Sequence, residues 1–192
     1  LGTFHALCAR LLRSDGKSID IDPHFVIYDA ADQISLIKRS FQEAGIDPKQ
    51  YTPRSVISAI SAAKSQMVTP GDHHHGARSY FDEVVGRIYE QYQRLLAESH
   101  ALDFDDLLMR TVQMFRRNPD ILSRYQERYR HLMVDEFQDT NLVQYEIIKQ
   151  LGNKYGNICV VGDPDQSIYS WRSADLRNIL SFENDFTETK LV

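Results

Sequence analysis

Three acidic side chains within five residues are the clearest sign of chemistry in this 192-residue chain. Asp135, Glu136 and Asp139 follow the apolar stretch HLMV, whose alternating Leu132 and Val134 are typical of a β-strand. Carboxylates at the end of a parallel strand suit a divalent cation and a water nucleophile. One can hold Mg²⁺ against a nucleotide phosphate while its neighbour orients or deprotonates the attacking water. The pattern therefore indicates a nucleotide-hydrolysing site.

Helix capping is the alternative explanation for part of this acidic cluster. Asp139 and Thr140 are both good N-caps, and acids favour the N-terminus of a helix, so for either residue alone capping explains its presence as well as a role in chemistry does. Capping does not account for Asp135 and Glu136, three or more residues earlier. Asp163, which ends the second apolar stretch NICVVGD, places another carboxylate at the same predicted sheet edge.

A second motif, VVGDPDQSIYSWRSAD at 160–175, combines polar and aromatic side chains. In an extended segment Tyr169 and Trp171 point to the same side and, beside Arg172, form a platform for unpaired bases worth ~1–3 kcal/mol per base. Alternatively, Trp171 fills the core. Gln166 could orient water near a phosphate or simply bond to backbone. It precedes Trp171 by at most ~17 Å of chain, so one segment could contact a phosphate and a DNA base.

A phosphate-binding glycine loop is absent from the chain. GDHHHGAR at 71–78 has the glycine spacing of such a loop, but Ala77 and Arg78 replace its lysine and hydroxyl residue, and no apolar strand precedes it. We expect a solvent-exposed loop. Its three adjacent histidines are interpreted as loop residues rather than metal ligands, because adjacent side chains diverge.

Helical periodicity and capping signals predict a mostly helical N-terminal part, and apolar runs predict strands later in the chain. A strand, a helix and a strand at 131–163 predict a parallel pair, covered on both faces. Between the helices, DGKSIDIDPH and MVTPGDHHHGARS are predicted as loops. The predicted helices cover 3–13, 30–44, 53–66, 79–100, 104–116, 120–128 and 141–151, and FVIYD at 25–29 is a short strand or extended segment.

Composition sets outer limits on the class of protein. The chain has 22 Lys and Arg against 27 Asp and Glu; residues 1–130 hold 17 of each, so the acidic excess lies in 131–192. No apolar run approaches the ~20 residues of a membrane span, and no secretory signal opens the chain. Cys8 and Cys159 are predicted as buried thiols in a reducing, cytoplasmic setting. The absence of an initiator Met suggests a piece of a longer protein.

Four motifs in order carry a resemblance to a known family: GTFHALCARLLR, LDFDDLL, VDEFQDTN and VVGDPDQSIYSWRSAD. Together they resemble the superfamily 1A DNA helicases of the UvrD, Rep and PcrA type. The fold class that this implies is α/β: an incomplete RecA-like (P-loop NTPase) parallel-sheet domain with a mostly α-helical inserted subdomain. Residues 1–20 and 106–192 would belong to motor domain 1A, and 21–105 to the inserted subdomain 1B.

The resemblance also implies a role for individual residues. Asp135 would bind Mg²⁺, Glu136 would act on the attacking water, and Gln166 would sense the γ-phosphate of ATP. Thr3 and His5 would touch the DNA backbone, with Phe4 shaping the turn. The implied DNA-binding residues are Thr3, Phe4, His5, Tyr169, Trp171 and Arg172.

The implied function is that of a fragment of an ATP-dependent DNA helicase. It would couple Mg-ATP hydrolysis to movement along single-stranded DNA and to unwinding at single-strand/duplex junctions, 3′ to 5′, in DNA repair or replication. The phosphate loop would lie upstream and a second motor domain downstream, so this piece alone should not hydrolyse ATP. A subunit of a helicase–nuclease complex and a DNA-binding or interaction module with a vestigial ATPase are the alternatives. Ser170 and Ser173 depart from the family's usual Arg and Gly.

Overall fold

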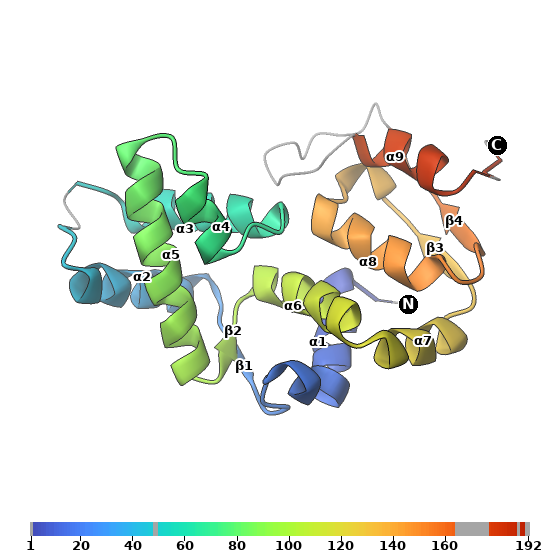
Figure 1. Cartoon of the computed structure of the whole chain (residues 1–192), viewed down its shortest axis with the longest axis horizontal. Coiled ribbons are helices and arrows are strands. Elements are labelled where there is room, and N and C mark those ends of the chain that lie inside the picture. Colours follow the sequence, from blue (N-terminus) through green and yellow to red (C-terminus); the bar gives the residue numbers. More distant parts are fainter. Residues whose placement is uncertain (1, 48–49, 164–176, 188, 191–192) are drawn as a thin grey trace. The chain divides into compact units, whose positions relative to one another are not determined.

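The computed structural model describes residues 2–47, 50–163, 177–187 and 189–190 (Figure 1). The chain divides into two compact units, Leu1–Arg110 and Thr111–Val192, called here the N-terminal and C-terminal units. In the part of the chain that is described, no helix is long and apolar enough to cross a membrane.

The N-terminal unit is mostly helical, as the sequence predicts. The residues before its helices cap them: Thr3 accepts a hydrogen bond from Ala6 N–H, and Asp29 and Ser79 each form a reciprocal capping box. Its elements are α1 (Phe4–Asp15), the 3₁₀ turn η1 (Gly16–Ile19), β1 (Val26–Ile27), α2 (Ala30–Ala44), α3 (Pro53–Ser65), α4 (Pro70–His75), α5 (Tyr80–Glu98), β2 (Ala101–Leu102) and the start of α6 (Phe104–Arg117).

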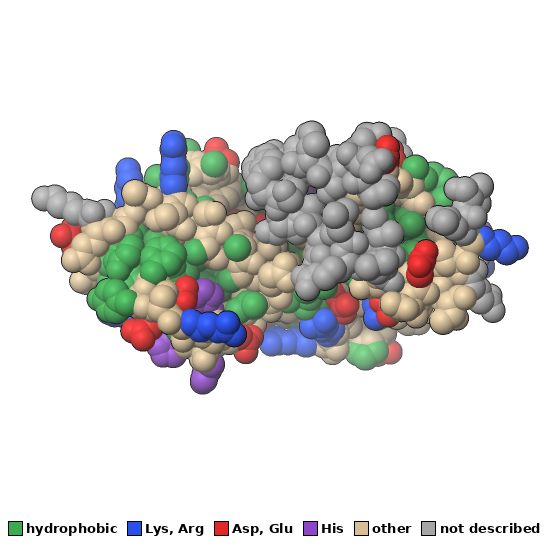
Figure 2. All heavy atoms as spheres, turned by 90° about the horizontal axis from the view of Figure 1, so that it is seen from above, with side chains coloured by type: hydrophobic (Ala, Val, Ile, Leu, Met, Phe, Trp, Pro, Cys, Tyr) green, Lys and Arg blue, Asp and Glu red, His purple; other side chains and the backbone are tan. Residues whose placement is uncertain are grey.

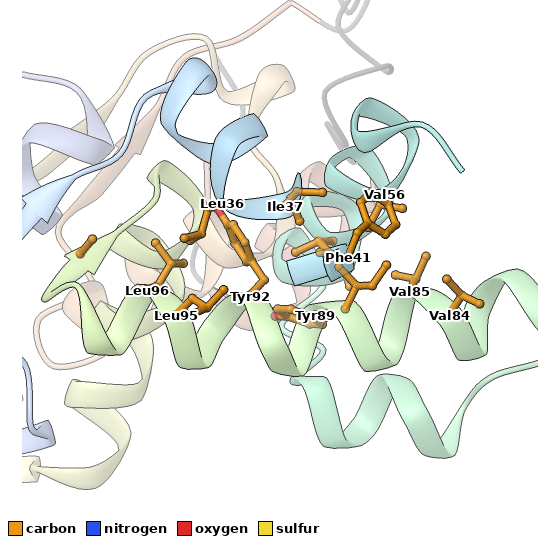
Figure 3. Packing of buried hydrophobic residues seen from close by; sticks show 14 residues of the cluster. Leu36, Ile37, Phe41, Val56, Val84, Val85, Tyr89, Tyr92, Leu95 and Leu96 are labelled. Atoms are coloured by element: carbon orange, nitrogen blue, oxygen red, sulfur yellow. The ribbon is translucent and has the colours of Figure 1, made fainter. Parts of the chain in front are cut away.

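The core of this unit lies between α2, α3 and α5 (Figure 3). Helix α5 contributes the most residues, and its Tyr89 and Tyr92 are almost fully buried. Phe41 of α2 and Val56 of α3 pack against the same face of α5 (Figure 3). The apolar residues at i, i+3 and i+4 that predict these helices are thus the same residues that line their buried faces. Gly45 ends α2 in the left-handed conformation, φ 66°, the expected C-cap.

Two predictions for the N-terminal unit need correction. Residues 67–79 are not a loop throughout, because Pro70–His75 form α4, which Thr69 and Asp72 start with a capping box. The histidines of this segment lie on α4, and His74 and His75 are exposed; Figure 2 shows histidine side chains at the surface. The loop predicted at 15–24 contains η1. The described residues hold no cluster of three or more potential metal-ligating side chains.

A parallel pair of two-residue strands joins the start and the end of the helical block. Val26 pairs with Ala101 and Ile27 with Leu102. The first strand confirms the prediction for FVIYD, whereas the second was not predicted. A strand of two residues leaves almost no periodicity to detect, so only the pairing reveals it.

An ion cluster of Lys64, Asp103 and Asp106 is buried where β2 leads into α6. The Lys64 Nζ lies 2.7 Å from Asp103 Oδ2 and 2.9 Å from Asp106 Oδ1, and all three side chains are at most 3% exposed. Tyr92 donates its hydroxyl to Asp103 over 2.9 Å, and Gln93 donates to Asp106 over 2.8 Å. Charges so far from water need these partners, so the cluster ties α3, α5 and the start of α6 together.

Burial and mutual charge shift the pKa values around this cluster. Burial alone would lower the pKa of Lys64, but the carboxylates of Asp106 and Asp103 outweigh it and raise that pKa. Burial opposes ionisation of Asp103, yet the Lys64 ammonium holds the pKa of that carboxyl below its usual range. Burial and the charge of Asp103 raise the pKa of Asp105 to about 6. The acids of the segment LDFDD thus have strongly shifted pKa values, and Lys64 is the structural partner of Asp103 and Asp106.

The C-terminal unit contains a parallel strand–helix–strand, as predicted. Leu132 pairs with Ile158, Met133 with Cys159 and Val134 with Val160, so the strands run in the same direction. The connection passes through α8, the helix expected at 141–151. The elements are the rest of α6, α7 (Pro119–Arg128), β3 (Leu132–Val134), the 3₁₀ turn η2 (Phe137–Asp139), α8 (Leu142–Gly152), β4 (Ile158–Val160) and α9 (Arg177–Asp185).

The expectation that this sheet is covered on both faces is wrong for the part of the chain described. Met133 is 78% exposed and Val161 51% exposed, and Cys159, paired with Met133, is exposed as well. Cys159 is therefore not the buried thiol that its apolar neighbours suggest, although Cys8 is buried as predicted. An apolar strand indicates that a face of its sheet can be covered. Whether that face is covered depends on the elements that pack around the sheet.

Candidate active site

The predicted acidic cluster lies on a tight turn directly after β3, called here the carboxylate turn (Asp135–Thr140). Asp135 and Glu136 are exposed, and Asp135 Oδ1 accepts the Glu136 backbone N–H over 3.0 Å. The backbone of Glu136 is left-handed, with φ 52° and ψ 44°. A non-glycine residue in this region is uncommon and is found preferentially at functional sites. The two acids predicted to do chemistry therefore project together from the end of a parallel strand.

The end of β4 holds the carboxylate turn in place. Phe137 N–H donates to Val161 O over 2.9 Å, and Val161 N–H donates to Val134 O over 2.8 Å. Asp163, predicted to share this sheet edge, approaches the turn through its backbone, because its N–H donates to Gln138 Oε1 over 3.1 Å. The carboxyl ends of the two parallel strands thus meet at the turn, the usual place for a ligand in such sheets.

Helix α9 secures the other end of the carboxylate turn. The buried Asn178 donates from Nδ2 to Thr140 O over 2.9 Å and to Thr140 Oγ1 over 3.2 Å. Phe182 of α9 packs edge-on against Phe137, with ring centroids 5.6 Å apart. The turn is therefore fixed by hydrogen bonds and aromatic packing, while its two leading acids remain accessible.

Capping of α8 does not involve the predicted residues. The N-cap is Asn141, whose side chain accepts from Gln144 N–H while Gln144 returns a bond to Asn141 N–H. Thr140 instead donates its hydroxyl to Phe137 O over 2.7 Å. Asp139 Oδ1 is buried and has no hydrogen-bond partner among the described residues. The capping alternative is thus wrong for both Asp139 and Thr140.

The first residues predicted to contact DNA lie at the N-terminus of α1, in the other unit. Thr3 caps the helix, and its exposed hydroxyl accepts from Ala6 N–H over 3.2 Å. Phe4 and His5 are half-buried, and the His5 ring meets Phe104 edge-on at 5.7 Å. Burial lowers the pKa of His5, which favours the neutral form of its imidazole. The first turn of α1 carries no acid that would repel an anion from the helix N-terminus.

Four predicted site residues lie outside the described residues: Gln166, Tyr169, Trp171 and Arg172. Their predicted roles at the γ-phosphate and on DNA stay predictions. The residues on either side of this stretch, Asp163 and Asn178, both contact the carboxylate turn.

The donor set at the carboxylate turn fits a nucleotide-bound Mg²⁺. Asp135 is an exposed carboxylate, and the hydrogen bond that it accepts from the Glu136 N–H uses only one of its oxygens. Mg²⁺ in such sites is held by one or two carboxylates, the substrate phosphates and water, rather than by a cage of protein ligands. Among the described residues, no Lys or Arg lies within ion-pair distance of Asp135 or Glu136. The charge of these two acids is therefore available to an external cation.

The chain belongs to the family of the UvrD/REP helicase N-terminal domain, whose family model matches residues 1–187. Among known proteins it is 46% identical to the ATP-dependent DNA helicase PcrA of Bacillus subtilis (strain 168) and 47% identical to that of Staphylococcus epidermidis (strain ATCC 12228 / FDA PCI 1200). Both matches cover all of this chain but 26% of the relative, so the chain spans about a quarter of their length.

Sequence reasoning missed three residues that build the site: Gln138, Gly162 and Asn178. Gln138 is 2% exposed and joins the carboxylate turn to the end of β4. A Cβ on Gly162 would lie 2.6 Å from Gln138 Oε1, so a larger residue at this position would have to displace the Gln138 amide. The only sequence signals were a neutral amide among acids and a glycine directly after an apolar strand.

Proposed function

We propose that the chain is part of motor domain 1A, with inserted subdomain 1B, of an ATP-dependent DNA helicase. The observation that carries this proposal is the accessible Asp135–Glu136 pair at the end of β3, in a chain of the UvrD/REP helicase family. The parallel β3–α8–β4 unit is compatible with a RecA-like domain, in which residues 1–20 and 106–192 would belong together and 21–105 would be the insertion.

Each acid of the pair has a separate role in the proposed reaction. Asp135 holds Mg²⁺, which neutralises charge on the triphosphate when bound. Glu136 orients the attacking water and accepts its proton. Gln166 monitors the γ-phosphate, a role that rests on the motif alone. The exposure of Asp135 and Glu136 supports these roles, because both carboxylates are open to a ligand and to water.

DNA binding is proposed for two separate stretches. Thr3 and His5 contact the phosphate backbone of single-stranded DNA, with Phe4 supporting the turn. The first turn of α1 carries no acid that would repel a phosphate, which supports this role. Tyr169 and Trp171 stack on bases, with Arg172 nearby. Hydrolysis would thereby drive 3′ to 5′ movement and unwinding at junctions, in cytoplasmic DNA repair or replication.

The whole protein provides the test. Glu136→Gln keeps the size of the side chain but removes its ability to accept a proton, so we expect DNA-stimulated ATP hydrolysis to fall by about 10²- to 10⁴-fold. Glu183→Gln, the same change at an exposed glutamate of α9, is the control and should keep the parental rate. A parental rate in Glu136→Gln would overturn the proposed function.

The 192-residue chain alone is expected to be inactive. Its sequence contains no phosphate loop, so it should neither bind ATP tightly nor hydrolyse it. Weak, salt-sensitive binding to single strands is expected at most. Measurable hydrolysis by the purified chain that disappears with Glu136→Gln would contradict this part of the proposal.

A further inference from the structure

Gln138 is a buried amide at the centre of the carboxylate turn, and the resemblance assigns it no role. Its Nε2 donates to Glu136 Oε2 over 2.6 Å, and its Oε1 accepts the Asp163 N–H over 3.1 Å. The residue is 2% exposed. A buried polar side chain with both ends bonded is held in a single position.

The orientation of this amide follows from its two partners. The Asp163 N–H can only donate, so it must face the amide oxygen of Gln138. The Glu136 carboxylate can only accept when ionised, so it must face the amide nitrogen. In a flipped amide, the nitrogen would face the Asp163 N–H and the oxygen would face the Glu136 carboxylate. Gln138 can therefore contact Glu136 only as a donor.

The backbone of Gly162 blocks movement of the Gln138 amide away from Glu136. A Cβ at this position would lie 2.6 Å from Gln138 Oε1 and 3.2 Å from Gln138 N, so the backbone at Gly162 packs directly on the amide. With Gly162 and the Asp163 N–H behind it, the amide presents its nitrogen to Glu136. Among the described residues, no other side chain donates to the Glu136 carboxylate.

We infer that Gln138 is a positioning residue that fixes the orientation of the Glu136 carboxylate toward the attacking water. This inference rests on the proposed function. An exposed glutamate side chain samples several rotamers, whereas a donor at 2.6 Å holds one carboxylate oxygen and leaves the other for water. Reactions of this kind lose rate steeply when a reacting group is displaced by about 1 Å.

The first test measures steady-state ATP hydrolysis by the whole protein carrying Gln138→Leu. We expect kcat to fall about 10- to 100-fold while the KM for ATP changes less than about twofold, because the amide acts through Glu136 rather than on the nucleotide. Gln138→Glu still accepts the Asp163 N–H but cannot donate to Glu136 when ionised, so it should show a similar loss. Parental kcat in either variant would overturn the inference.

Two further variants separate positioning from folding. Gly162→Ala displaces the same amide without changing its chemical groups and should lower kcat with little change in KM. Gln144→Leu is the matched control, because it removes a hydrogen bond to Asn141 N–H in the cap of α8 and does not touch Glu136. We expect it to lower the free energy of unfolding and to keep the parental kcat. Loss of kcat in Gln144→Leu equal to that in Gln138→Leu would indicate a general structural effect and overturn the inference.

A double variant shows whether Gln138 acts through Glu136. In single-turnover measurements, adding Gln138→Leu to Glu136→Gln should cause no further loss, because groups that act as a unit are not additive. A further loss as large as that of Gln138→Leu alone would overturn the inference. A parental rate in Glu136→Gln overturns the proposed function and this inference together, whereas loss in Glu136→Gln without loss in Gln138→Leu overturns only the inference.

Discussion

LDFDD at 102–106 and VDEFQD at 134–139 each place three acidic side chains within a few residues, yet they lie in opposite environments. In the first, Asp103 and Asp106 are at most 3% exposed and contact the Lys64 ammonium. In the second, Asp135 and Glu136 are exposed, and the described residues offer them no Lys or Arg at ion-pair distance. The nearest partner of Glu136 is the neutral amide of Gln138.

This difference separates a structural cluster from a candidate ligand site. Where the protein supplies the cation itself, the acids hold helices together and have no capacity left for a ligand. Where only neutral donors fix the acids, their charge is available to a metal ion. Composition and spacing alone would rank the two motifs equally, so the partner of each carboxylate decides the chemistry.

The largest effect should follow from removing the buried cation. Lys64→Met leaves Asp103 and Asp106 buried beside each other without the ammonium that contacts both, so we expect the free energy of unfolding of the chain to fall by about 3–5 kcal/mol. Urea unfolding followed by circular dichroism measures this. Lys38→Met, at an exposed position of α2, is the control and should stay within about 0.5 kcal/mol. A loss below about 1 kcal/mol for Lys64→Met would break the comparison.

A smaller, pH-dependent effect is expected at Asp105. Its folded-state pKa of about 6 lies above the ordinary 3.8, so folding favours the protonated carboxyl. The resulting stabilisation is present below about pH 4 and is lost as pH rises through 6. Asp105→Asn cannot ionise and should be more stable than the parent by roughly 1–3 kcal/mol at pH 7.5, converging with it near pH 4.

Urea unfolding at a series of pH values checks this expectation. Asp120→Asn, at an exposed aspartate of α7, serves as the control and should show no such pH dependence relative to the parent. Equal stability of Asp105→Asn and the parent at every pH would mean that burial does not perturb this carboxyl.

The smallest effect concerns the anchor of the carboxylate turn. Asn178→Ala removes two hydrogen bonds to Thr140 and leaves a buried carbonyl without that donor, so we expect a loss of about 1–2 kcal/mol. Thermal unfolding of the chain measures it, with Glu183→Ala at an exposed position of the same helix as the control. An unchanged midpoint for Asn178→Ala would show that aromatic packing alone holds α9 to the turn.

Local signals in the sequence account for most of the fold. Apolar periodicity and cap signals such as Gly45 placed helices as far as α8, whereas α9 was not predicted, and the apolar runs placed the parallel strands of the C-terminal unit. The short helix α4 was missed although its capping signal, Thr69 followed by Asp72, can be read directly. A six-residue helix is too short for periodicity to outweigh its glycine and proline.

Contacts between distant residues account for what the sequence did not reveal. Asp135 and Glu136 were found because the strand and the acids are contiguous, but the position of the Gln138 amide depends on Asp163, 25 residues later. Likewise, Lys64 meets Asp103 across 39 residues, and nothing local marks it as buried. The exposure of Met133 depends on which elements cover the sheet, and the strand's own residues do not encode that.

The unequal exposure of the two cysteines has a practical consequence. Because Cys8 is buried and Cys159 is exposed on β4, a maleimide dye should react with one thiol per chain without any engineered cysteine. The label would sit four residues before Asp163, whose backbone contacts the carboxylate turn. Its emission could then report changes at the sheet edge while an oligonucleotide is added to the labelled chain.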